Sequence, residues 1–178
     1  MEKRIQATKA MLRIAITGPE SSGKTTLCSL LSQHYNVSCI PEFARAYLEK
    51  TQGKYKQLDL DHIAQGQLKS LLSFEDKIAI CDTDFSVLEI WSKYKYNNVS
   101  EIIRELVNKE LFDLHILCTP DIPWEADKLR ENPHSRAHLF ELYQSSLSKY
   151  NKNFIVVSGT QQNRIENSLQ AIEKLINL

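Results

Sequence analysis

Apolar positions form two alternating patterns along the chain. Five short runs are almost continuously apolar, which is typical of strands buried on both faces of a parallel sheet. These predicted strands are Met11–Thr17, Val37–Ile40, Ile78–Cys81, Leu114–Cys118 and Phe154–Val157. The segments between them repeat apolar residues every three or four positions, which predicts amphipathic helices. The alternation predicts an α/β fold in three layers, with a central five-stranded parallel sheet and right-handed crossovers.

Four helical stripes are clear, and burial against the sheet is sufficient to explain them. We therefore interpret their residues as core. The stripes are Leu60, Ile63, Ala64, Leu68, Leu71 and Leu72; Ile102, Ile103, Leu106 and Val107; Leu139, Leu142, Tyr143, Leu147 and Tyr150; and Ile165, Leu169, Ile172, Leu175 and Ile176.

A glycine-rich loop joins the first predicted strand to the first helical segment. Its sequence is Gly18-Pro19-Glu20-Ser21-Ser22-Gly23-Lys24-Thr25-Thr26. Spacing and context match the G-x-x-x-x-G-K-[ST] phosphate-binding loop, so all these residues are predicted to hold a nucleoside triphosphate. The loop amides and the helix N-terminus favour phosphate oxygens. Lys24 is expected to bridge the β- and γ-phosphates during catalysis, and the Thr25 hydroxyl to bind Mg²⁺.

Polar residues follow the second and third predicted strands, where a parallel sheet binds its ligands. Asp82 ends an apolar strand, the pattern of a carboxylate that holds Mg²⁺ directly or through water. Asp84 has the same parity as Asp82, so it either contacts the substrate hydroxyl or caps a helix starting at Phe85. Glu42 and Arg45 either bind substrate hydroxyls or form an ion pair at a helix end.

A Pro- and Asn-rich segment, residues 120–136, follows the fourth predicted strand. Arg130 and Arg136 are predicted to act from a lid that closes over the phosphates, because phosphoryl transfer develops negative charge. The alternative is a solvated loop with ordinary surface charges. Trp124 either anchors that lid or offers its face to an aromatic ring.

Bulk properties suit one domain over residues 1–178, with residues 1–10 as a loose extension and Met11 as an alternative start. Basic and acidic residues balance at 22 each, which argues against nucleic-acid or anionic-membrane partners. No apolar run approaches membrane-spanning length. The four cysteines lie far apart without a C-x-x-C pair, so neither a zinc knuckle nor a disulfide framework is expected, and a reducing cytoplasm is predicted.

Several of these motifs together resemble one family. Gly-Pro-Glu-Ser-Ser-Gly-Lys-Thr-Thr, Pro-Glu-Phe-Ala-Arg-Ala-Tyr, Asp-Thr-Asp-Phe and Pro-Trp-Glu-Ala-Asp-Lys-Leu-Arg occur in that order between about Leu12 and Gly159. The chain resembles the ribosylnicotinamide kinase domain of NadR-type NAD-salvage proteins. It shows neither the His motif of the adenylyltransferase domain nor a DNA-binding helix-turn-helix.

The resemblance implies a nucleoside-kinase-like P-loop fold that uses ATP to phosphorylate nicotinamide riboside in NAD salvage. It places ATP phosphates at Gly18 to Thr26 and metal support at Asp82. Substrate contacts are implied near Glu42, Arg45 and Asp84, and lid roles for Trp124, Arg130 and Arg136. A kinase for another nucleoside or small hydroxyl compound, and an ATP-binding regulatory module, are the alternatives. The sequence carries no signal for oligomeric state.

Overall fold

Five parallel strands form the sheet of the computed structural model, which describes residues 11–128 and 134–177. Their order across the sheet is β2-β3-β1-β4-β5. The strands are β1 (Leu12–Thr17), β2 (Cys39–Ile40), β3 (Ile78–Cys81), β4 (Leu114–Cys118) and β5 (Phe154–Val157). The predicted α/β fold is confirmed, although β2 is shorter than the apolar run that predicted it.

The central strand, β1, lies between β3 and β4, with Leu12 opposite Ile78 and Ile16 opposite Ile116. From β1 the chain moves to one side of the sheet for β2 and β3, and later to the other side for β4 and β5. The strand order therefore reverses beside β1, and ligands bind such sheets outside the carboxyl ends of the strands at this point.

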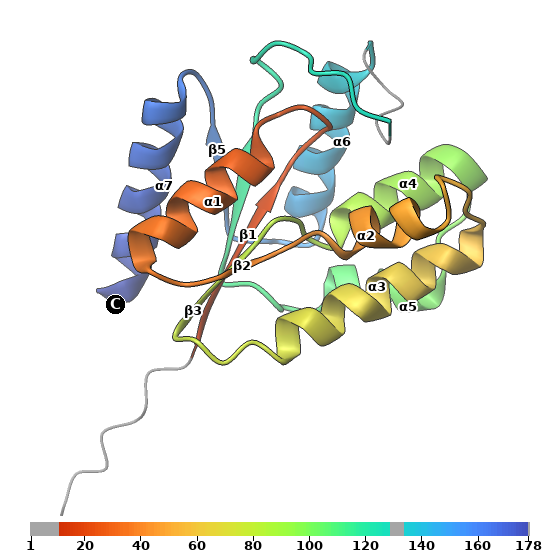
Figure 1. Cartoon of the computed structure of the whole chain (residues 1–178), viewed down its shortest axis with the longest axis horizontal. Coiled ribbons are helices and arrows are strands. Elements are labelled where there is room, and N and C mark those ends of the chain that lie inside the picture. The colour runs from red at the N-terminus through yellow and green to blue at the C-terminus, as the bar shows by residue number, and fades with distance from the viewer. Residues whose placement is uncertain (1–10, 129–133, 178) are drawn as a thin grey trace, which may run out of the picture.

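Helices cover both faces of the sheet (Figure 1). One layer consists of α1 (Lys24–Tyr35) and α7 (Gln161–Ile176), which contact each other. The opposite layer consists of α2 (Phe43–Lys50), α3 (Gln57–Leu72), α4 (Ser86–Tyr96), α5 (Glu101–Asn108) and α6 (Arg136–Lys149). No helix within residues 11–128 and 134–177 combines the length and apolar character needed to cross a membrane.

The two cores explain why the strands read as continuous apolar runs. Ile80 packs in the core beneath α1 and α7, whereas its neighbours Ala79 and Cys81 pack in the core beneath α2–α6. Successive residues of a strand face opposite sides of a sheet, so a sheet covered on both faces needs apolar residues at every position.

The loop between β1 and α1 needs its glycines. Gly18 has a φ of +136°, and a Cβ there would lie 2.6 Å from the carbonyl oxygen of Cys118 at the end of β4. Gly23 has a φ of +83° and is the N-cap of α1. Both positions are in the region of positive φ that disfavours any residue with a Cβ.

Arg164, in the first turn of α7, is bonded to the backbone of this loop. It is 4% exposed and donates hydrogen bonds to the carbonyl oxygens of Ser22 (2.8 Å) and Thr119 (3.1 Å). It also pairs with Asp121. One guanidinium therefore ties the β1–α1 loop to the segment that follows β4, and the planar fork of arginine suits such multiple contacts.

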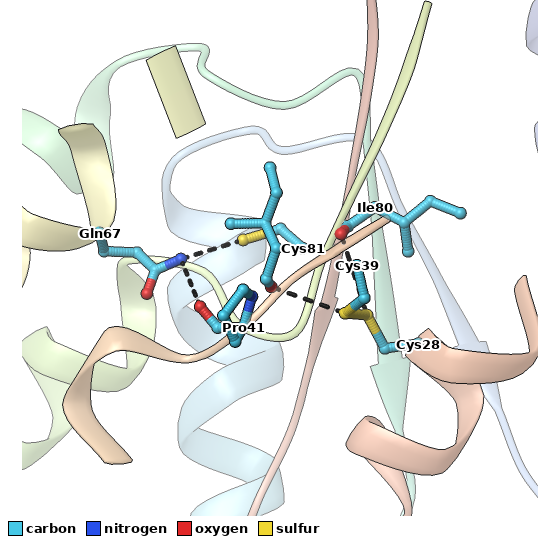
Figure 2. The surroundings of a disulfide bond; sticks show 7 residues. Cys28, Cys39, Pro41, Gln67, Ile80 and Cys81 are labelled. Atoms are coloured by element: carbon cyan, nitrogen blue, oxygen red, sulfur yellow. Dashed lines mark hydrogen bonds between the residues drawn. A yellow bond between two sulfur atoms is a disulfide. The ribbon is translucent and has the colours of Figure 1, made fainter. Parts of the chain in front are cut away.

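Two of the cysteines form a disulfide, although the spacing of the cysteines predicted no disulfide framework. Cys28 of α1 is bonded to Cys39 of β2, with their Cα atoms 6.3 Å apart (Figure 2). The sequence hides this pair because α1 packs beside β2 only after the chain turns back between them. Cys81 and Cys118 are buried thiols, and burial raises their pKa values to about 12 and about 11.

The Cys28–Cys39 bond is predicted to stabilise the fold. Its 11-residue separation closes a short loop, so its reduction should lower the free energy of unfolding by about 2–3 kcal/mol. Chemical denaturation with and without reductant measures this change. Peptide mapping of non-reduced protein should find Cys28 joined to Cys39. Recovery of both as separate alkylated thiols, with unchanged stability in reductant, would contradict the prediction.

Arg164→Ala is predicted to lower the free energy of unfolding by about 2–4 kcal/mol, because it removes the charged donor that bonds to the carbonyl oxygens of Ser22, Thr119 and Gly159. The matched control is Arg104→Ala on the exposed side of α5, which should change stability by less than about 0.5 kcal/mol. Urea denaturation compares the two variants. Equal, small effects of both would show that Arg164 does not support the loop.

Candidate functional site

A cavity of about 170 Å³ opens at the carboxyl ends of β1 and β3. One end is formed by the β1–α1 loop and the other by α2, α4 and α6. The charged residues of the lining come mainly from the β1–α1 loop and the start of α2, whereas the aromatic residues come from α4 and α6. The lining includes Glu20, Lys24, Thr25, Glu42, Arg45, Thr83, Trp91, Glu125 and Tyr143.

The β1–α1 loop forms the cradle that its sequence predicts. Every residue from Gly18 to Thr26 except Pro19 lines the cavity. The ammonium group of Lys24 donates to the carbonyl oxygens of Gly18 (2.9 Å) and Pro19 (2.8 Å), so the side chain folds back over the loop. Directly after Gly23, the unpaired N–H groups of α1 begin, and such a helix N-terminus attracts anions.

Thr25 and Asp82 lie together beside this cradle. The Thr25 hydroxyl donates to the Asp82 carboxylate, whose Oδ1 atom is buried and has no hydrogen-bond partner among residues 11–128 and 134–177. Burial raises the pKa of Asp82, against the opposing effects of Thr25, Lys24 and Arg45. A buried carboxylate oxygen without a partner fits a bound cation.

The donor set suits Mg²⁺. Magnesium keeps several waters and is bound by one or two protein oxygens together with substrate phosphates. Residues 11–128 and 134–177 contain no group of three or more His, Cys, Asp or Glu side chains able to hold a metal. Thr25 and Asp82 would therefore share the ion with the phosphates of a nucleotide.

Glu42 and Arg45 both line the cavity from the start of α2. Burial is the main cause of the raised pKa of Glu42. The nearby Asp82 adds to the shift, while Lys24 and Arg45 oppose it. Arg45 forms an ion pair with Asp127 at 3.2 Å, and its side chain is 49% exposed. Arg45 thus connects the cavity wall to the segment that follows β4.

Asp84 does not reach the cavity, contrary to its predicted contact with the substrate. Its carboxylate is buried and accepts hydrogen bonds from the hydroxyls of Thr17 (2.8 Å) and Ser86 (2.6 Å). It also makes no capping bond, because α4 begins at Ser86 with Phe85 as its N-cap. The parity argument fails since β3 ends at Cys81, and the chain beyond it is no longer extended.

The segment predicted as a lid touches the β1–α1 loop. The Glu125 N–H donates to the hydroxyl of Ser21 (2.8 Å), and Arg136, at the start of α6, donates to the Ser21 carbonyl oxygen (3.1 Å). Trp124 packs against Arg136, with the guanidinium carbon 5.7 Å from the ring centre, and does not line the cavity. Arg130 lies outside the described residues.

Two aromatic residues of the cavity were not predicted. Trp91 of α4 stacks against Tyr55 at 6.2 Å between ring centres, and Tyr143 of α6 is buried. Burial raises the pKa of Tyr143 well above its ordinary value, so its hydroxyl stays protonated. The helical stripe correctly predicts that Tyr143 is buried, but periodicity does not distinguish a core face from a cavity wall.

Comparison with known proteins places this geometry among P-loop proteins. Over 124 residues, the chain is 32% identical to the trifunctional NAD biosynthesis/regulator protein NadR of Escherichia coli (strain K12). The NadR protein of Salmonella typhimurium (strain LT2) matches equally. Each alignment covers 66% of this chain and 30% of the relative. The chain therefore corresponds to less than a third of these relatives.

Solved structures share the fold. A NadR protein in complex with NR superposes with a TM-score of 0.76 at 19% identity, covering 94% of this chain and 52% of that one. Deoxyadenosine kinase from M. mycoides with bound dCTP gives a TM-score of 0.58 at 19% identity, covering 92% of this chain and all of the other.

The predicted resemblance to NadR proteins is confirmed by these relatives. A family described as "AAA domain" matches residues 13–164, from the second residue of β1 to the first turn of α7. The chain belongs to this AAA domain family.

Proposed function

We propose that this chain is a kinase that transfers the γ-phosphoryl group of ATP to the primary hydroxyl of a nucleoside, with nicotinamide riboside as the preferred acceptor. The observation that carries the proposal is the composition of one cavity. The phosphate cradle forms one end, with Asp82 behind it next to Thr25, and Glu42 and two aromatic residues line the rest. A nucleotide-binding module that acts only as a switch would not need this second part.

The donor end requires one rearrangement. Lys24 now donates to Gly18 and Pro19, and it must exchange these carbonyl oxygens for phosphate oxygens when ATP binds. Bound Mg²⁺ would neutralise phosphate charge, while Thr25 and Asp82 hold it beside the loop. Lys24 then stabilises the charge that develops on the γ-phosphoryl group during transfer.

Glu42 is the carboxylate best placed to act on the acceptor. Of Glu42 and Asp84, only Glu42 lines the cavity. It orients the 5′-hydroxyl and accepts its proton as the hydroxyl oxygen bonds to the γ-phosphorus and the bond from that phosphorus to ADP breaks. The raised pKa of Glu42 makes its ionised form a stronger base than an ordinary glutamate. Arg45 would donate to the ribose diol with the part of its guanidinium that does not contact Asp127.

The aromatic residues support a flat and cationic base. Trp91 and Tyr143 line the cavity from two different helices, α4 and α6. The nicotinamide ring of the riboside carries a positive charge, which favours the face of an aromatic ring, and tryptophan most of all. Trp91 therefore takes the ring-binding role in this proposal, in place of Trp124.

Similarity to NadR proteins supports nicotinamide riboside over other nucleosides. The curated relatives are described as NAD biosynthesis proteins, and one similar structure contains NR. The decisive experiment incubates the purified chain with ATP, Mg²⁺ and a panel of nucleosides, read by mass spectrometry. Nicotinamide riboside should exceed adenosine, cytidine, uridine and thymidine in kcat/KM. Preference for one of the others would overturn the substrate, and ATP turnover that no acceptor stimulates would favour the regulatory module.

Lys24→Ala is predicted to lower kcat by about 10²- to 10³-fold, because it removes charge stabilisation in the transition state. The dissociation constant for ATP should change less, since the loop amides remain. The matched control is Lys69→Ala on the exposed side of α3, which should keep full activity. Steady-state kinetics and nucleotide titration measure both variants, and near-normal turnover by Lys24→Ala would refute the assignment.

Trp91→Ala is predicted to raise KM for nicotinamide riboside by roughly 10- to 30-fold, as expected for losing a desolvated cation–π contact of about 2 kcal/mol. KM for ATP should change little, because Trp91 belongs to α4 and not to the β1–α1 loop that is proposed to hold the phosphates. Trp124→Ala serves as the control, since Trp124 lies outside the cavity lining. A larger rise in riboside KM for Trp124→Ala than for Trp91→Ala would return the ring to Trp124.

A further inference from the structure

Two adjacent residues of α3, Gly66 and Gln67, break the pattern of the helix that contains them. Gly66 lies in the interior of a 16-residue helix, where glycine costs about 1 kcal/mol relative to alanine. Gln67 is 3% exposed, although its neighbours on the same face are the apolar residues Ile63, Ala64 and Leu71. Local departures from the rules of a helix often mark a functional requirement.

The amide of Gln67 contacts both neighbours of Glu42. Its Oε1 atom accepts a hydrogen bond from the Phe43 N–H at 2.7 Å, and its Nε2 atom donates to the Pro41 carbonyl oxygen at 3.3 Å. The same Nε2 atom lies 3.2 Å from the sulfur of Cys81, the residue before Asp82 (Figure 2). One side chain therefore links the turn that carries Glu42 to the strand end that carries Asp82.

Gly66 accommodates the same turn. A Cβ atom at this position would lie 2.4 Å from two carbons of the Phe43 ring, far inside any normal contact. The ring of Phe43 thus packs directly on the backbone of α3, where only glycine leaves room. Both unusual residues of the helix are explained by one task, which is to hold residues 41–43.

We propose that Gly66 and Gln67 are positioning residues that fix the Glu42 carboxylate relative to Asp82 and the phosphate loop. The proposal rests on the proposed role of Glu42 in accepting the proton of the nucleoside hydroxyl. A glutamine buried in a core is costly unless its polar atoms are satisfied, and the atoms that satisfy Gln67 are backbone groups on either side of Glu42. The buried amide of Gln67 is therefore explained by the placement of Glu42 rather than by core packing.

A purely structural role and a positioning role differ in kinetics. If Gln67 only stabilised the fold, its replacement would lower stability and leave the kcat of the folded enzyme intact. If it positions Glu42, kcat falls while KM for ATP stays the same, because the hydrogen bonds of Gln67 reach Phe43, Pro41 and Cys81 and not the phosphate loop. A displacement of about 1 Å at a reacting group is enough to cost roughly 10²-fold in rate.

The test uses Gln67→Leu, which keeps the volume and removes both polar groups, and Gly66→Ala, which displaces Phe43. Each should lower kcat for nicotinamide riboside by about 10- to 100-fold without changing KM for ATP. The matched control is Leu71→Ala, fully buried one turn further along α3, assayed at a temperature where every variant is folded. It should lose stability but keep kcat.

A double variant separates action through Glu42 from any other effect. In a Glu42→Gln background, adding Gln67→Leu should cause no further loss of kcat, because the group that it positions is already gone. An equal loss with and without the Glu42 carboxylate would overturn the proposal. So would an unchanged kcat in both Gln67→Leu and Gly66→Ala.

Amide hydrogen exchange at Phe43 tests, without any nucleoside, whether Gln67 holds residues 41–43. Gln67→Leu removes the acceptor of the Phe43 N–H, so exchange at that amide should accelerate. The control Leu71→Ala keeps this acceptor, so exchange at Phe43 should be slower in Leu71→Ala than in Gln67→Leu. Unchanged exchange would overturn this role of Gln67 even in an active kinase. Absence of transfer to every nucleoside by the wild-type protein, or full activity of Glu42→Gln, would instead refute the proposed function.

Discussion

The parallel direction of all five strands is the constraint on which the cavity depends. Because every strand ends at the same edge of the sheet, the residues that follow β1, β2 and β3 meet although they are far apart in the sequence. The β1–α1 loop, Glu42 and Asp82 are brought together in this way. An antiparallel β3 would place Asp82 at the opposite edge, away from Thr25, and no arrangement of side chains would restore their contact.

Positions at this edge are then refined by buried polar groups from the surrounding helices. Arg164 of α7 holds the β1–α1 loop against the segment after β4, and Gln67 of α3 holds the turn of Glu42. Each reaches several backbone groups, so each satisfies atoms that would otherwise be buried without partners. The β1–α1 loop and the turn that carries Glu42 are thus supported by helices on opposite faces of the sheet.

The sequence predicted the sheet and the phosphate loop because both depend on local signals: continuous apolar runs, and glycines at fixed spacing before a helix. It was less informative wherever the deciding contact is distant in sequence. Asp84 shares parity with Asp82 but turns inward to Thr17, Trp91 replaces Trp124 at the cavity, and Cys28 pairs with Cys39. Likewise, the apolar stripe of α3 places position 67 on the buried face, but it does not show that the Gln67 amide bonds to the residues on either side of Glu42.

Electrostatics links the two ends of the cavity. Burial raises the pKa values of both Glu42 and Asp82, and the charge of Asp82 adds to the shift at Glu42, so ionisation of Asp82 disfavours ionisation of Glu42. In the kinase proposed above, a cation held by Asp82 together with the nucleotide would offset that repulsion and favour the ionised form of Glu42, which is the form able to accept a proton. Binding of the nucleotide with its cation would therefore lower the pKa of Glu42 in the proposed kinase.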